Sequence, residues 1–282
     1  MPSLQNIKRR FRSVRGIHQI TKAQQLVAAS KLRRVQQAAV APQAYTAAAR
    51  ELLARLSSDP VARRNPFFIK RPANNALVIV VAGDRGMAGA YNSNVIRALG
   101  RHLGEVQAPM RAICVGKRAS MFVAHAKNVD ELASYDISGK GLDIMVAQPA
   151  LQEALDLYLT GEVDVVHMIY TEFVSTVKQQ VQVRQLLPVE APEEASQVSE
   201  TEPEAEELVD FATRRVLEAD LLQAILEARA SEEAARMVAM MNATDNAGEL
   251  MEDLTLAFNN ARQANITQEL AEISGGAEAI TQ

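Results

Sequence analysis

A long helical pattern at the C-terminal end of the chain limits the possible folds more than any other part of the sequence. From Leu208 onward, only Gly248 interrupts this pattern before the Gly275-Gly276 pair. A helix of about 65 to 70 residues would be roughly 100 Å long. Apolar and small residues recur at alternating steps of three and four, which favours a coiled coil. The predicted seam positions are Met240, Ala243, Ala247, Leu250, Leu254, Ala257, Ala261, Ala264, Gln268 and Ala271.

A second helical pattern covers the N-terminal end, clearly to Pro42 and more weakly to Leu56. Its length of about 50 residues corresponds to a helix of roughly 80 Å. Two long helices at opposite ends of the chain predict an antiparallel pair, in which the second helix extends past the first. The predicted apolar stripe of the first helix consists of Leu4, Ile7, Phe11, Val14, Ile17, Ile20, Val27, Leu32 and Val35.

Charge is strongly segregated although the formal net charge is only -4. Residues 1–50 contain no Asp or Glu, whereas the stretch 190–207 carries many acidic residues and no basic one. Segments of opposite charge favour pairing within the chain or with oppositely charged partners. Nucleic acid is the competing partner for the basic segment, but the negative net charge disfavours it.

The middle of the chain alternates β-branched runs with helical patterns, which predicts an α/β fold with a parallel sheet covered on both faces. An alternating stretch at 174–187 predicts a further strand at a sheet edge. The expected strands are 76–82, 111–116 and 163–170, and the expected helices are 87–103, 117–126 and 148–159. The chain thus divides into an N-terminal coiled-coil helix (1–58), an α/β domain (75–190), an acidic linker (191–207) and a C-terminal coiled-coil helix (208–282).

The turn at Gly83–Gly86 lies between a predicted strand and a predicted helix, where a phosphate-binding loop would be found. It matches neither G-x-G-x-x-G nor G-x-x-x-x-G-K-[ST], so we predict a tight turn. The four histidines form no i, i+4 pair, and Cys114 has no second cysteine as a companion. We therefore expect no cofactor, no metal site and no catalytic residue.

No segment of the sequence predicts a membrane span, because the longest apolar run, 76–82, is too short to cross a bilayer. The N-terminus lacks the apolar segment of a secretory signal, although its basic character is similar to that of a transit peptide. On this basis we expect a soluble chain.

A set of motifs along nearly the whole chain closely resembles the gamma subunits of F-type ATP synthases. These motifs are Ile20–Lys31, Asp84–Gly86, Phe173–Thr176, Gln185–Pro188, Ser231–Met237, Met241–Ala247, Leu254–Leu256, Ala261–Thr267 and Ser274–Ala277. Two departures from the usual family pattern are Gln24, where a Met is usual, and Met87–Ala90, where the family usually reads Leu-Cys-Gly-Gly.

The resemblance implies a central rotor stalk of a proton-transporting ATP synthase, with two coiled terminal helices and a Rossmann-like domain. Its implied partners are the alpha and beta subunits of the catalytic ring, the epsilon subunit and the membrane c ring, with one copy per complex. The implied location is the cytoplasmic face of a bacterial plasma membrane, with the basic start forming part of the stalk. The stalk itself would not be catalytic, because catalysis takes place in the ring.

The resemblance also implies contacts between this chain and the alpha-beta ring. The implied contact residues are Arg9, Lys22, Arg34, Arg85, Arg262, Gln263 and Thr267. Two other classes of function stay open on the sequence: a nucleic-acid-binding basic coiled coil, and a degenerate Rossmann-fold enzyme that uses the turn at Gly83.

Overall fold

Two long helices begin and end the described chain, as the sequence predicts. The structure is a computed structural model, and the residues it describes are 4–56, 64–106, 108–137, 143–189 and 205–281. Helix α1 spans Leu4–Leu56 and helix α5 spans Ala205–Thr281. Most of the acidic linker expected at 191–207 lies outside the described residues.

The chain divides into two compact units. Unit 1 consists of Met1–Ala28 together with Met237–Gln282, and unit 2 consists of Ala29–Arg236. Helices α1 and α5 contribute residues to both units. Unit 1 is therefore a pair of helical segments, and unit 2 contains the sheet.

The sheet of unit 2 has five strands in the order β3-β2-β1-β4-β5. Strands β1 to β4 are parallel to their neighbours, and β5 pairs with β4 in the antiparallel direction. The strand bounds are Ala76–Val81 for β1, Met110–Val115 for β2, Val129–Tyr135 for β3, Val165–Phe173 for β4 and Gln179–Leu187 for β5.

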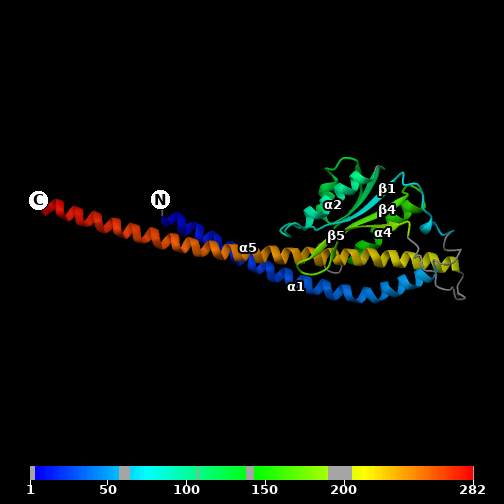
Figure 1. Ribbon diagram of the computed structural model, residues 1–282, viewed down its shortest axis with the longest axis horizontal. Coiled ribbons are helices and arrows are strands. Elements are labelled where there is room, and N and C mark those ends of the chain that lie inside the picture. The colour runs from blue at the N-terminus through cyan, green and yellow to red at the C-terminus, as the bar shows by residue number, and fades with distance from the viewer. Residues whose placement is uncertain (1–3, 57–63, 107, 138–142, 190–204, 282) are drawn as a thin grey trace. The chain divides into compact units, whose positions relative to one another are not determined.

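Helices cover both faces of this sheet (Figure 1). Helices α2 (Tyr91–Glu105) and α3 (Lys117–Val123) pack on one face, where Val78 and Val80 of β1 point. The opposite face carries Leu77 and Ile79 of β1 and packs against helix α4 and the first part of α5. Helix α4 spans Asp143–Leu159, and a short 3-10 helix, η2, spans Pro66–Phe68. Because both faces are covered, every residue of β1 is buried.

The sequence predicted this architecture but missed one strand. The α/β class, the parallel sheet with two covered faces and the added strand at 174–187 are confirmed, the last as the antiparallel edge strand β5. Strand β3 was not predicted, because its burial alternates and it has no continuous apolar run. Its pairing with β2 stabilises it instead.

The two helical segments of unit 1 are antiparallel (Figure 1). The seam on the α1 side proceeds from Ile7 at regular three- and four-residue steps, and its other members are Phe11, Val14, His18, Thr21, Gln25 and Ala28. The predicted stripe was wrong at Ile17, Ile20 and Val27, which are all more than half exposed. The error arose because His18, Thr21 and Gln25 are polar, so the search for apolar residues moved to the neighbouring stripe.

The seam on the α5 side of unit 1 was half correct. Its positions at regular four- and three-residue steps are all buried or half-buried: Met240, Thr244, Ala247, Met251, Leu254, Phe258 and Ala261. The expected positions Leu250 and Ala257 were wrong by one residue, because the steps run four-three rather than three-four, whereas Ala243 is half-buried beside Thr244. Leu250, expected in the seam, is 44% exposed, and its neighbour Met251 takes its place. The positions expected after Ala261 are exposed.

The fold class is therefore that expected, a pair of long antiparallel helices with a Rossmann-like α/β domain. Across the described parts of the chain, no helix combines the length and the apolar character that a bilayer span requires.

Candidate functional site

The turn after β1 is held by one amide side chain. The backbone N–H of Gly83 donates a hydrogen bond to Asn92 Oδ1 at 3.0 Å, and Asn92 Nδ2 donates to the carbonyl of Arg85 at 3.1 Å. Asn92 belongs to α2, which follows this turn. It thereby fixes both ends of the segment that presents Arg85, whose side chain is exposed.

Asp84 occupies the hydrogen-bond donors that a phosphate would use at this sheet edge. Its Oδ1 accepts a hydrogen bond from the backbone N–H of Lys117 at 2.9 Å, and its Oδ2 accepts one from the N–H of Ile137 at 3.1 Å. A carboxylate bound by two backbone amides takes the place of an anionic ligand. The hydrogen-bonding capacity of these two backbone amides is thus satisfied within the chain.

The end of β2 approaches this turn so closely that only glycine fits there. Gly116 has a φ of +99°, and a Cβ atom at this position would lie 2.1 Å from the carbonyl oxygen of Ala82. This value is in the left-handed region that favours glycine. The backbone at the end of β1 and the backbone at the end of β2 therefore pack directly against each other, with no room for a side chain at position 116.

The exposed end of α5 is a separate candidate surface, in unit 1. From Arg262 to Ser274, every residue of the helix is exposed. Ile266, Leu270 and Ile273 are 49, 63 and 70% exposed, at steps of four and three residues. An apolar stripe on a helix without a covering partner indicates a surface that another protein contacts.

Three of the expected contact residues lie on this exposed end of α5, at Arg262, Gln263 and Thr267. They lie within two turns of one helix, and the hydroxyl of Thr267 donates to the carbonyl of Gln263 at 2.9 Å. Arg9 and Lys22 are also exposed in unit 1, where Arg9 donates a hydrogen bond to Asn6 Oδ1 at 3.2 Å.

The two other expected contact residues, Arg34 and Arg85, belong to unit 2 and are exposed there. The structure thus brings Arg262, Gln263 and Thr267 together on one helix. The seven expected contact residues as a whole are divided between the two units. Sequence reasoning missed the exposed Ile17 and Ile20 as candidate contact residues, although their apolar stripe was the signal that could have found them.

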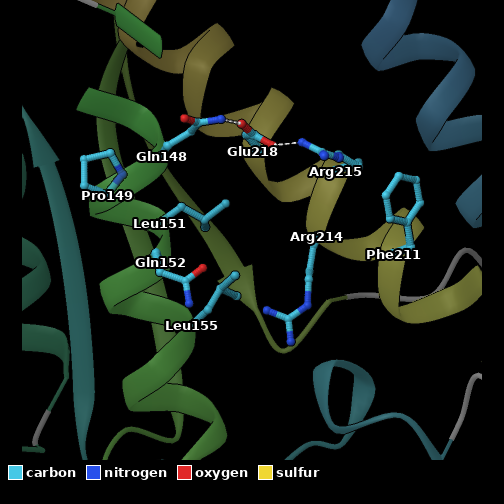
Figure 2. Close-up of a pocket in the computed structure, with 9 residues that line it drawn as sticks. All are labelled: Gln148, Pro149, Leu151, Gln152, Leu155, Phe211, Arg214, Arg215 and Glu218. Carbon is cyan, nitrogen blue, oxygen red and sulfur yellow. Dashed lines mark hydrogen bonds and ion pairs between the residues drawn. The ribbon is translucent and has the colours of Figure 1, made fainter. Parts of the chain in front are cut away.

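A groove of about 440 Å³ lies between α4 and α5 in unit 2 (Figure 2). Its lining residues are Gln148, Pro149, Leu151, Gln152, Leu155, Phe211, Arg214, Arg215 and Glu218. Figure 2 shows Gln148 and Arg215 converging on the carboxylate of Glu218, at 2.6 and 2.8 Å.

Both arginines of this groove are already paired. Arg214 Nε lies 2.9 Å from Asp210 Oδ2, and its guanidinium lies over the ring of Phe67 at 5.2 Å. Arg215 lies over the ring of Phe211 at 5.3 Å, besides its ion pair with Glu218. The positive charges of both arginines are therefore compensated by carboxylates of the same chain.

Burial shifts the pKa values of several titratable groups in unit 2, among them Cys114, His102 and His167. Burial raises the pKa of the Cys114 thiol to about 12, so this cysteine stays protonated and unreactive. His102 and His167 meet with their ring centroids 4.6 Å apart, a contact that the sequence did not predict. Among the described residues, no group of three potential ligands could hold a metal ion.

A Rossmann-like domain combined with a long antiparallel helix pair is a fold that the chain shares with two solved structures. A chain of the rotor of the Euglena gracilis mitochondrial ATP synthase has this fold, with a TM-score of 0.68 over 93% of this chain and 98% of that chain, at 20% identity. A chain of the Tetrahymena thermophila mitochondrial ATP synthase central stalk and c ring gives a TM-score of 0.62 over 79% and 99%, also at 20% identity.

Sequence comparison identifies the family within this fold. The family model described as ATP synthase matches residues 3–280. The ATP synthase gamma chain of Desulfitobacterium hafniense is 39% identical over 281 residues, 99% of this chain and 100% of that protein. The gamma chain of Chloroflexus aurantiacus is 39% identical over 295 residues and the full length of both proteins. The chain belongs to the ATP synthase gamma chain family.

Proposed function

We propose that this chain is the central rotor stalk of a bacterial proton-transporting F-type ATP synthase. It couples rotation of the membrane c ring to ATP synthesis or hydrolysis in the ring of alpha and beta subunits. The observation that carries this proposal is the exposed end of α5, where Arg262 and Gln263 lie beside an apolar stripe. A ring of other subunits is a protein partner that would cover this apolar stripe.

The mechanism follows from contacts that differ between rotary positions. A ligand or partner shifts an equilibrium between conformations only if it binds one of them better than the others. A stalk that touches each beta subunit differently therefore changes the relative stability of its empty and nucleotide-bound conformations. Arg9, Lys22, Arg34, Arg85, Arg262, Gln263 and Thr267 are the proposed contacts with the ring.

We assign no catalytic step to the chain itself. The carboxylate of Asp84 already accepts hydrogen bonds from Lys117 and Ile137, so the sheet edge after β1 offers no free phosphate cradle at these two amides. In this proposal the chain acts by contacting the ring subunits and rotating within the ring, and the ring subunits hold the reacting phosphates.

The other proposed partners are the epsilon subunit and the c ring, with one gamma chain in each complex. The groove between α4 and α5 supports a protein partner in unit 2, because its arginines are compensated and Phe211 is 58% exposed. The proposed location is the cytoplasmic face of the plasma membrane, where the chain is held peripherally by its partners.

Replacing Arg262 and Gln263 together by Ala tests the proposed function. Charge-assisted hydrogen bonds that form in only one rotary position contribute about 1.5 to 3 kcal/mol each. Losing them should lower ATP turnover of the assembled complex by about tenfold or more. Ala is a strong helix former, so the helix itself should persist.

The matched control replaces Glu252 and Asp253 by Ala, a second exposed adjacent pair on α5. This control should keep the parent turnover. Full assembly of the Arg262→Ala/Gln263→Ala complex with parent turnover would contradict the proposed contact.

A further inference from the structure

The motif Ser231–Met237 has a structural role that the proposed function does not use. Within unit 2, Ser231 of α5 is fully buried, and its hydroxyl donates a hydrogen bond to the carbonyl of Thr171 in β4 at 3.2 Å. This bond fixes one turn of α5 against the sheet. The next residue, Glu232, then lies against the turn after β1.

Glu232 is a buried carboxylate held by a buried guanidinium. Only 9% of Glu232 is exposed, and Arg236, one helical turn later, donates a hydrogen bond to its Oε1. Burial raises the pKa of Glu232 above its ordinary value, although the positive charge of Arg236 acts in the opposite direction. A buried charge of this kind is tolerated where its partner is fixed beside it.

Arg236 also connects this carboxylate to helix α1. Its Nη1 lies 2.8 Å from Oε2 of Glu233, and the same residue, Glu233, forms an ion pair with Lys31 of α1 at 3.5 Å. Glu232 and Glu233 thus share one arginine but face different neighbours. Only Glu232 lies against the turn.

The contact between Glu232 and the turn is close. A Cβ atom at Gly83 would lie 2.6 Å from Oε1 of Glu232 and 3.2 Å from Oδ1 of Asn92. A side chain at position 83 would therefore have to displace the carboxylate that Arg236 holds. Its N–H is bonded to Asn92, which also holds the carbonyl of Arg85.

We infer that Glu232, held by Arg236, is a positioning residue that fixes the Gly83–Gly86 turn and thereby the place of Arg85. The effect passes from the carboxylate to Gly83, from Gly83 to Asn92 and from Asn92 to the backbone of Arg85. This inference rests on the proposed function, because it supplies the support that a contact of Arg85 with the ring requires.

Two substitutions in the full chain distinguish positioning from general stability. Glu232→Ala should raise the amide hydrogen-exchange rate of Gly83 at least fivefold, while the amides of central strand β1 keep their protection. Glu232→Gln should restore the parent exchange rate, because an amide of the same size still accepts the hydrogen bond from Arg236. Glu233→Ala is the matched control, since it loses the same arginine partner without touching the turn.

A double-mutant cycle in the assembled complex tests the path to Arg85. Glu232→Ala should lower ATP turnover about fivefold, and this loss should disappear in an Arg85→Ala background, because the two residues act through one contact. Gly83→Ala, which pushes against the carboxylate from the other side, should reproduce the loss if Glu232→Ala does not fold.

The outcomes separate the two proposals. If the Arg85→Ala complex turned over ATP at the parent rate, the proposed contact of Arg85 with the ring would be wrong. The positioning role of Glu232 would then be tested by the hydrogen-exchange rate of Gly83 alone. Unchanged exchange at Gly83 in Glu232→Ala, or a turnover loss that adds fully to that of Arg85→Ala, would overturn the positioning role.

Discussion

The hydroxyl oxygens of Thr21 and Thr244 lie 2.8 Å apart inside the helix pair, although 223 positions separate the two residues. Both residues are buried. Farther along unit 1, Ile7 and Phe11 of α1 surround a small apolar cavity of about 240 Å³ together with Leu254 and Phe258 of α5. As the residue number falls in α1 it rises in α5, so these contacts define one antiparallel register.

This register predicts a specific cross-link. Cysteines at positions 21 and 244 should form a disulfide within one chain on mild oxidation, because facing seam residues bring their Cβ atoms within disulfide reach. Non-reducing electrophoresis and mass spectrometry would identify the bond. Ile20→Cys with Thr244→Cys is the control, since Ile20 is 59% exposed and faces away from the seam. Cross-links that form only between chains would contradict this register.

The strand ends around Gly116 predict a large loss of stability on adding one methyl group. Gly116→Ala would place a Cβ 2.1 Å from the carbonyl oxygen of Ala82 at a φ of +99°. We expect the free energy of unfolding to fall by about 3 kcal/mol or more. Gly100→Ala in α2 is the matched control: its Cβ meets no atom within 4 Å, so it should add about 0.5 to 1 kcal/mol. Urea unfolding measures both, and equal effects would refute the argument.

The half-buried His167 predicts that acid destabilises the chain. Burial and the neighbouring His102 lower the pKa of His167 to about 4 from 6.5. Between these two pH values the unfolded state binds the proton and the folded state does not, so stability falls as the pH falls. The full shift corresponds to about 3 kcal/mol, and solvent screening of the partly exposed imidazole reduces the loss across this window to about 1 to 2 kcal/mol. Burial also lowers the pKa of His102, against the opposing charge of Glu105.

Urea unfolding of the full chain at several pH values between 7 and 4.5 would measure this dependence. His167→Leu should flatten much of the slope. His125→Gln, at an exposed position, should leave it unchanged. An equally steep loss in the His167→Leu variant would assign the acid sensitivity to other groups.

The occupied amides at Lys117 and Ile137 predict that the isolated chain does not bind ATP. The Asp84 carboxylate accepts both hydrogen bonds, and a phosphate would have to displace a charged group fixed within the same chain. Calorimetric titration with ATP and magnesium should give no binding heat. A dissociation constant in the micromolar range would show that the turn binds nucleotide after all.

The long helices and the alternating core were predictable, because their periods repeat over many residues. The seam of α5 was predictable only in part, since the exposed residues Leu250 and Ala257 are apolar just as the seam residues Met251 and Phe258 are. Polarity concealed the middle of the α1 seam, where Thr21 is buried. In these cases packing against the partner helix determines which face is buried, and the sequence of one helix alone does not indicate that face.

The candidate site was less predictable than the fold. The expected contact residues came from a family resemblance, and their roles stay predictions. The support of the turn by Glu232 depends on a contact between α5 and a turn far away in the sequence. Neither Gly83 nor Glu232 alone indicates this contact, because it exists only after the sheet and α5 have packed together.

The small and polar side chains in the middle of the unit 1 seam have a mechanical consequence. At His18, Thr21 and Gln25 the α1 side of the seam is polar rather than apolar, and interlocking of large apolar side chains is what resists sliding and twisting in a coiled coil. We therefore expect this stretch to have a lower torsional stiffness than a leucine-packed pair.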